Sequence, residues 1–194
     1  RSQNSSIEVI FKARSGIAHR LDKETSGVMV VGKTPESLES LMGQFKARET
    51  KKEYLALVHG LVEPDEGIIN LPIGRSPYNR HKLRVDVYGK SAMTEYRVEK
   101  QYQSIEYQDG FTLVRLFPKT GRTHQIRVHM AQIGHPLVGD ELYGGRKRTL
   151  RDREWCPRHF LHAAKLGFWY PNSKKWVVFE VQLPEDLVGA LNHV

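Results

Sequence analysis

The amino-acid sequence predicts an α+β fold, with several strands and a few helices in a single domain of 194 residues. Three observations lead to this prediction. Side chains alternate between two faces over several short segments, which is typical of strands. Apolar residues recur at helical spacing in two longer segments. These segments do not follow one another in a regular strand–helix order, which argues against a parallel, doubly wound sheet.

The first elements are expected before residue 48. Arg1–Ser6 is a polar start to which we assign no element, and Val28–Val31 is a short apolar run that suits a buried strand. Thr34 is a good helix N-cap, and Pro35 suits the first helical position. A helix is therefore predicted over Pro35–Ala47. Its apolar face, at i, i+3, i+4 and i+7, consists of Leu38, Leu41, Met42 and Phe45.

Strands dominate the middle of the chain. Glu53–His59, Ala92–Val98 and Phe111–Phe117 all have the alternation of a strand. Gln108-Asp109-Gly110 is a turn signal between the second and third of them.

One more helix and one more strand complete the prediction. Ile126, Met130 and Ile133 lie at i, i+4 and i+7, and Gly134 suits a helix C-terminus, so His124–Ile133 is predicted to be helical. Trp176–Leu183 returns to strand spacing.

Composition excludes several classes of protein. The chain has 30 Lys and Arg against 22 Asp and Glu, a formal charge of +8, which points to an anionic partner. Its single cysteine, Cys156, excludes an internal disulfide and cysteine-based zinc ribbons. No apolar stretch is long enough to span a membrane, and Arg1–Ser6 lacks the apolar core of a signal peptide. We therefore expect a cytoplasmic protein, and a first residue other than Met indicates that the chain begins within a longer product.

The first candidate site is the polar segment His19–Gly27, just before the predicted strand at Val28. Polar side chains at the start of an apolar strand can place catalytic groups on a rigid base. A solvated loop, with a local turn bond to Asp22, explains the same spacing. Asp22 and Glu24 would share a face on a strand, but this is weak support for a glycosidase carboxylate pair.

The second candidate site is Pro118–His129, which combines a strand end, a glycine turn and a helix N-terminus with basic residues. This arrangement can offer backbone N–H groups to an anion, although a capped structural helix is the alternative. A metal site built from His124, His129 and His135 is a weaker hypothesis, because their spacing is not a known ligand pattern. We therefore predict no metal site.

Basic residues form three clusters, two of them with an aromatic residue among them. Positive charge next to an aromatic ring suits an RNA backbone and a stacked base, although ordinary solvated charge is the alternative. The clusters are Arg146, Lys147, Arg148, Arg151, Arg153 and Arg158 with Trp155; Arg75, Arg80, His81, Lys82 and Arg84 with Tyr78; and Lys46, Arg48, Lys51 and Lys52.

Two long motifs in this order resemble those of the RluA-like family of RNA pseudouridine synthases. The first is His19–Gly27, and the second runs from Gly121 to Met130 and continues through Gly134–Asp140 and Tyr143-Gly144. Lys52–Ala56 resembles the family's intermediate motif, and Leu161-His162-Ala163 and Leu183-Pro184 also match. The resemblance covers about Gly16 to Leu187, nearly the whole chain.

The resemblance implies a fold and an activity. The fold is a mixed, mostly antiparallel sheet with flanking helices and a central RNA-binding cleft. The activity is isomerisation of uridine in structured RNA to pseudouridine, without metal or organic cofactor. The motif wording favours large-subunit ribosomal RNA, although relatives that act on tRNA share it. Two family features are missing, an upstream strand with a Lys-Pro turn and an S4 domain. We therefore expect residues 1–194 to be one catalytic domain that lacks its N-terminal portion.

The resemblance also assigns residues. Asp22 matches the catalytic aspartate, Arg127 its basic partner in a predicted salt bridge, and Tyr54 the tyrosine that stacks on the target uracil. Arg20 is placed to fill the gap left by a flipped base. Thr25, His124 and Gln125 are expected to support these groups. The other predicted RNA-binding residues are Arg75, Arg80, Lys82, Arg122, Arg146, Lys147, Arg148 and Arg151.

We expect a monomer that binds structured RNA and no membrane. Two other functions stay open at this point. One is a non-catalytic RNA-binding or ribosome-assembly module on the same fold. The other is a metal-dependent hydrolase built on the histidines.

Overall fold

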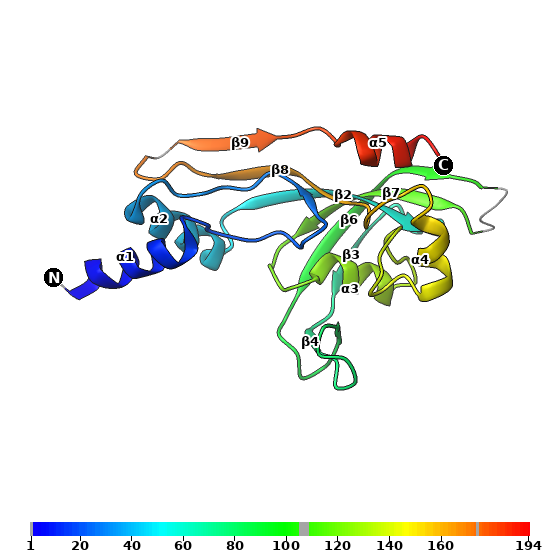
Figure 1. The fold of residues 1–194 in the computed structure, drawn as a ribbon, viewed down its shortest axis with the longest axis horizontal. Coiled ribbons are helices and arrows are strands. Elements are labelled where there is room, and N and C mark those ends of the chain that lie inside the picture. Colours follow the sequence, from blue (N-terminus) through cyan, green and yellow to red (C-terminus); the bar gives the residue numbers. More distant parts are fainter. Residues whose placement is uncertain (1, 105–108, 174) are drawn as a thin grey trace.

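A computed structural model of the protein describes residues 2–104, 109–173 and 175–194. In this part of the chain, a seven-stranded sheet has the order β1-β8-β2-β7-β6-β3, with β9 also paired to β8 (Figure 1). All its pairs are antiparallel except β1 with β8. The strands are β1 Ser26–Gly27, β2 Lys51–His59, β3 Glu66–Asn70, β6 Met93–Tyr102, β7 Phe111–Pro118, β8 Leu161–Trp169 and β9 Trp176–Glu180. The predicted α+β class and mostly antiparallel sheet are confirmed.

Two further strands form a separate hairpin, β4 (Ile73–Arg75) with β5 (Leu83–Val85). It projects from the body of the molecule below α3 in Figure 1. The five described helices are α1 Ser2–Arg14, α2 Pro35–Ala47, α3 Gln125–Gln132, α4 Arg146–Asp152 and α5 Glu185–Leu191.

The alternation of β2 separates two cores. Ala56 and Val58 pack with Ile126 and Met130 of α3, whereas Leu57 packs in a different cluster with residues of α5. Tyr54 packs beside the α3 cluster, so it shares a face with Ala56 and Val58. Because α3 lies directly on this face, the residues that it carries are brought to Tyr54.

Helix α2 has the predicted bounds because its signals are local. Thr34 and Ser37 form a capping box, and Pro35 stands in the first turn. Leu38 and Leu41 are buried against Leu166 of β8 and its neighbour Phe168.

Two sequence predictions at the N-terminal side are corrected. Helix α1 includes most of Arg1–Ser6, to which no element was assigned. Val28–Val31 is not a buried strand, since the strand there is the short β1 and Met29 and Val31 are 41% and 51% exposed. The reason lies in a distant part of the chain. The Val28 N–H donates to the Ala163 carbonyl, and beyond that residue the same edge of β8 is paired with β9, so β1 cannot extend along it.

Smaller corrections lie further along the chain. The basic cluster that begins at Arg146, for which no helix was predicted, includes helix α4 over Arg146–Asp152. Helix α3 begins at Gln125, with His124 as its N-cap, and Gly134 follows with a φ of 91°. Gln108 of the predicted turn lies outside the described residues. No helix in the described ranges combines the length and the apolar character that a membrane span requires.

Candidate active site

The two polar motifs meet at one pocket with a volume of about 460 Å³. The first motif contributes five residues to the wall, and the second contributes the whole turn that leads into α3. Helix α2 and strand β2 complete the wall with basic and aromatic side chains. The lining residues are His19, Arg20, Leu21, Asp22, Thr25, Phe45, Lys46, Arg48, Lys52, Tyr54, Pro118, Lys119, Thr120, Gly121, Arg122, Thr123, His124, Gln125, Ile126, Arg127 and Leu161.

The loop that carries Asp22 is fixed to the edge of β8. The Thr25 N–H donates to the Asp22 carbonyl at 2.9 Å and closes a turn. The next two residues, Ser26 and Gly27, pair in parallel with His162 and Ala163. Gly27 has a φ of 125°, and a Cβ there would lie 2.3 Å from the Ala163 carbonyl oxygen, so only glycine fits. Both the turn and the β1 bridge therefore fix where Asp22 enters the pocket.

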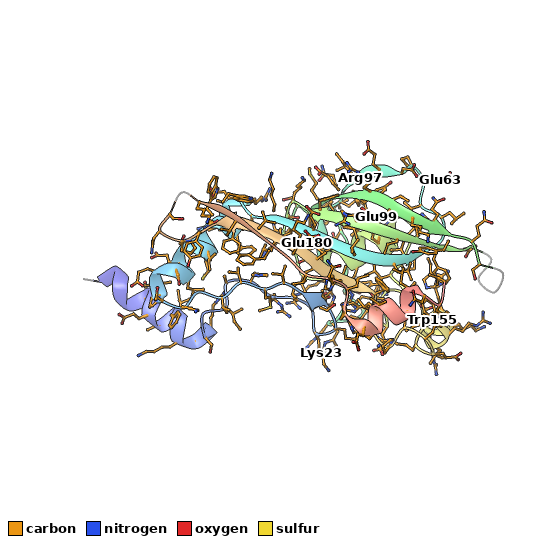
Figure 2. All side chains as sticks on the ribbon, turned by 90° about the horizontal axis from the view of Figure 1, so that it is seen from above. Lys23, Glu63, Arg97, Glu99, Trp155 and Glu180 are labelled. Carbon is orange, nitrogen blue, oxygen red and sulfur yellow. The ribbon has the colours of Figure 1, made fainter. Side chains whose placement is uncertain are left out.

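Side chains from the segment before β8 hold the same loop from behind. The Thr25 hydroxyl hydrogen-bonds the ring of His159 at 2.8 Å. The Arg153 guanidinium pairs with Glu24 at 2.9 Å, and Arg158 donates to the Glu24 carbonyl at 2.6 Å. Figure 2, seen from above, shows Lys23 of this loop near one edge of the sheet, and Arg97 and Glu99 of β6 toward the other edge. Arg153 and Arg158 were assigned to a basic surface cluster, but here they organise the Asp22 loop.

Arg127 of α3 joins two aspartates. Its Nε and Nη2 atoms donate to Asp140 at 2.7 and 2.8 Å, and its Nη1 donates to Asp22 at 3.3 Å. The predicted ion pair between Arg127 and Asp22 is therefore present. The side chain of Arg127 is 7% exposed and that of Asp22 is 17% exposed, whereas Asp140 is fully buried.

The Arg127–Asp140 pair is ionised in spite of its burial. Burial works against both charges, but the hydrogen bonds and the opposite charge hold the pKa of Asp140 below its ordinary value. The same bonds, with a smaller contribution from Asp22, raise the pKa of Arg127. Asp140 lies in the second motif, but the sequence analysis assigned no role to it. Its place just after the apolar run Leu137-Val138 was the signal available in the sequence.

Tyr54 gives the pocket a neutral aromatic wall. It is half-buried, and burial, followed by the negative charge of Asp22, raises its pKa to about 12. The phenol therefore stays protonated at neutral pH. This places a flat, uncharged ring beside a carboxylate, which suits the stacking of a planar base.

Gln125, like Thr25 on the Asp22 loop, makes hydrogen bonds that hold a segment of the pocket wall. The Gln125 side-chain oxygen accepts from the Thr120 hydroxyl and from the Arg122 N–H, at 2.6 and 3.0 Å. Its amide nitrogen donates to the Met93 carbonyl and to the Thr94 hydroxyl. These bonds fix the turn before α3 to β6 and thereby set the start of the helix that carries Arg127.

The three histidines of the metal hypothesis have separate partners. His124 bonds Tyr143, His129 lies between Thr94 and the Leu71 carbonyl, and His135 bonds the His59 carbonyl. Within the described ranges, no group of three or more potential ligand side chains was found together.

The predicted RNA-binding residues fall into two sets. Arg20 and Arg122 line the pocket, together with Lys46, Arg48 and Lys52. Burial, and then the charge of Arg48, lowers the pKa of Lys52 to about 8. The other set lies outside the pocket wall, with Arg75, Arg80 and Lys82 on the β4–β5 hairpin and Arg146, Lys147, Arg148 and Arg151 on α4.

Comparisons with known proteins assign the chain to a family. The family model described as RNA pseudouridylate synthase matches residues 3–132, about two thirds of the chain. The chain therefore belongs to the RNA pseudouridylate synthase family, and its resemblance to the RluA-like branch is confirmed by relatives named ribosomal large subunit pseudouridine synthase D.

Individual relatives show how far the similarity extends. An uncharacterized RNA pseudouridine synthase of Aquifex aeolicus is 46% identical over 89% of this chain and 54% of its own length. Ribosomal large subunit pseudouridine synthase D of Nitrosomonas europaea is 42% identical over 93% of this chain and 52% of its own length. The chain thus spans about half the length of these relatives. The solved structure of human RNA pseudouridylate synthase domain containing 1 is 31% identical, with a TM-score of 0.73 over 87% of this chain and 69% of that one.

Proposed function

We propose that this chain is the single catalytic domain of an enzyme that isomerises uridine to pseudouridine in structured RNA. Large-subunit ribosomal RNA is the proposed substrate class, because relatives that are 42% identical carry that substrate in their names. The observation that supports the proposal is the Asp22 carboxylate, which is held by the buried Arg127 in a pocket that Tyr54 also lines.

The proposed reaction is balanced without any added reagent. The bond from N1 of uracil to C1′ of ribose breaks, the base turns in the pocket, and C5 bonds to C1′. C5 then loses its proton and N1 gains one, so there is no net oxidation or reduction. The reaction therefore needs no redox cofactor. Asp22 acts as a carboxylate, either by attack at C1′ or by removal of a ribose proton that gives a glycal.

The pocket suits a flipped nucleoside. Its volume of about 460 Å³ lies within the usual range for small ligands, roughly 300–1,000 Å³. A base inside a stem must leave its stack before it can enter, which costs a few kcal/mol. Tyr54 returns part of this energy by stacking. Arg20, exposed at the rim, is placed to fill the gap that the base leaves in the stem.

The remaining basic residues are proposed to hold the RNA backbone. We assign Arg75, Arg80 and Lys82 of the hairpin, and Arg146, Lys147, Arg148 and Arg151 of α4, to phosphate contacts. The protein is also proposed to be monomeric and cytoplasmic. A tRNA substrate would use the same pocket chemistry.

An isosteric substitution tests the proposal. Asp22→Asn removes the charge but keeps the shape of the side chain. The rate of pseudouridine formation in ribosomal RNA transcripts is expected to fall by about 10³-fold or more, within the range for loss of a catalytic group. The Kd for RNA is expected to stay within about three-fold. The matched control is Asp65→Asn, an exposed aspartate outside the pocket wall.

Two outcomes would contradict the proposal. One is turnover of Asp22→Asn near that of the wild-type protein. The other is tight RNA binding by the wild-type full-length protein without any isomerisation, which would identify a non-catalytic RNA-binding module. Transcripts of ribosomal RNA and tRNA, assayed side by side, separate the two substrate classes.

A further inference from the structure

Tyr143 lies outside the pocket wall, yet it contacts both the β4–β5 hairpin and the catalytic pair. Its hydroxyl accepts a hydrogen bond from the Leu83 N–H of β5 at 3.0 Å. The same hydroxyl lies 3.0 Å from Nδ1 of His124, which does line the pocket. One oxygen atom therefore joins the hairpin backbone to the pocket wall.

The ring of Tyr143 makes the second connection. Its centroid lies 5.2 Å from the guanidinium carbon of Arg127, at cation–π distance. The Lys82 ammonium, from the hairpin, lies 5.4 Å from the same ring. Asp140, which holds Arg127, also accepts the Tyr143 N–H at 3.1 Å. Tyr143 is thus held through its backbone, its ring and its hydroxyl, and each of the three contacts the hairpin or the Arg127–Asp140 pair.

The contact between Tyr143 and His124 joins a phenol to a neutral imidazole. Burial lowers the pKa of His124, so its imidazole is neutral at physiological pH. The Tyr143 oxygen accepts from the Leu83 N–H, and the tautomer of the imidazole sets the direction of the bond to Nδ1 of His124. Replacement of Tyr143 by Phe would remove both bonds and keep the ring.

The hairpin is held at its base and open at its tip. At the base, Ile73 packs with Val128 of α3, and Leu83, Val85 and Tyr143 pack against them. At the tip, Tyr78 is 93% exposed and Arg80 is also exposed. RNA that binds at the tip and shifts the hairpin would therefore also shift its base, where Tyr143 packs.

We propose that Tyr143 is a positioning residue that couples RNA contact at the tip of the β4–β5 hairpin to the geometry of the Asp22–Arg127 pair. The inference rests on the proposed function, since it assumes that the hairpin binds the RNA substrate. It assigns a role to Tyr143 in the Tyr143-Gly144 part of the second motif, to which the sequence analysis attached no role.

A double-mutant cycle tests the coupling. Arg80→Ala removes an RNA contact at the tip, and Tyr143→Phe cuts the connection. In the full-length wild-type protein, Arg80→Ala is expected to lower the single-turnover rate constant at saturating RNA by about five-fold or more. In the Tyr143→Phe background, the same substitution is expected to change that rate constant less than about two-fold. The Kd for RNA should rise by the same factor in both backgrounds.

A control and a measurement without RNA complete the design. Tyr170→Phe, in the β8–β9 turn and 56% exposed, is the matched hydroxyl deletion and should leave the effect of Arg80→Ala as in the wild-type protein. Hydrogen exchange of the free protein should show faster exchange at Leu83 and along the hairpin in Tyr143→Phe, with the sheet unchanged. An exchange change confined to the hairpin shows that the variant is folded.

The inference is overturned if Arg80→Ala lowers the rate constant by the same factor with Tyr143 or Phe at this position. It is also overturned if the exchange at Leu83 is unaltered in Tyr143→Phe. A wild-type protein that forms no pseudouridine refutes the proposed function instead, and that result appears before any variant is compared.

Discussion

Loss of the charge at Asp140 should cost more stability than any surface charge on this protein. The Asp140 carboxylate accepts two hydrogen bonds from Arg127 and two from the backbone N–H groups of Leu142 and Tyr143. In Asp140→Asn, the amide nitrogen would face donors. Removal of one partner of a buried ion pair costs roughly 3–5 kcal/mol. Asp22 remains near Arg127, so we expect the lower end, about 3 kcal/mol.

Urea unfolding measures this effect. With a slope of roughly 2 kcal/mol per M, a loss of about 3 kcal/mol lowers the midpoint by about 1.5 M. The matched control is Glu66→Gln, because Glu66 pairs with Arg97 at 3.8 Å with both side chains largely exposed. That pair should contribute less than about 1 kcal/mol. Pseudouridine formation should also fall, since Arg127 loses the partner that orients it.

The pH dependence gives a second check. The pKa of Asp140 is lower in the folded state than in the unfolded state, so its contribution is complete above the unfolded value of about 4. It decreases as the pH falls from there toward the folded pKa. The difference in stability between the wild-type protein and Asp140→Asn should therefore shrink below about pH 4. A difference below about 1 kcal/mol at pH 7, or one that is unchanged down to pH 3, would refute the reasoning.

Three other predictions concern Arg127, two arginines of α4 and His159. Arg127→Lys keeps the charge but cannot bridge both aspartates, so turnover should fall by about 10²-fold or more, and near-normal turnover would contradict the geometry. The double variant Arg148→Glu and Arg151→Glu should raise the Kd for RNA and flatten its salt dependence, while the rate constant of bound RNA changes less than about two-fold. A loss confined to that rate constant would exclude phosphate contacts. His159 has a pKa lowered to about 4 by burial and then by Arg127, so unfolding measurements should show stability falling from about pH 6.5 to pH 4. His159→Gln should flatten this limb, and an unchanged limb would contradict the assignment.

Elements with local signals were predicted well. Helix α2 has its cap, its proline and its apolar spacing within 14 residues, and its bounds were predicted from them. Strands β2 and β7 were found because their alternation reports two buried faces. Val28–Val31 was predicted wrongly because its conformation depends on β9, which comes almost 150 residues later and pairs with the edge of β8 that the run would need.

The candidate site was also predicted only in part. The motif positions of Asp22, Tyr54 and Arg127 were enough to expect them in one pocket. The roles of Asp140 and Tyr143 were not predicted, because they depend on side-chain hydrogen bonds from a loop to other elements, to Arg127 of α3 for Asp140 and to Leu83 of β5 for Tyr143. Such bonds leave no periodic pattern in a sequence. For the same reason, Arg153 and Arg158 looked like surface charge although they hold the Asp22 loop.

The unequal bonds of Arg127 explain how a buried guanidinium can accompany a reactive carboxylate. If Asp22 were its sole partner, any movement of Asp22 toward the ribose would leave a buried charge without compensation, at a cost of roughly 3–5 kcal/mol. Asp140 instead takes the two short bonds, at 2.7 and 2.8 Å, and Asp22 takes the longer one, at 3.3 Å. The stability of Arg127 thus depends mainly on Asp140, so Asp22 can exchange its contact with Arg127 for one with the substrate at a smaller cost. The acid that stabilises the arginine and the acid proposed to react are therefore different residues, and their substitutions should separate: Asp140→Asn lowers stability and activity together, whereas Asp22→Asn lowers activity far more than stability.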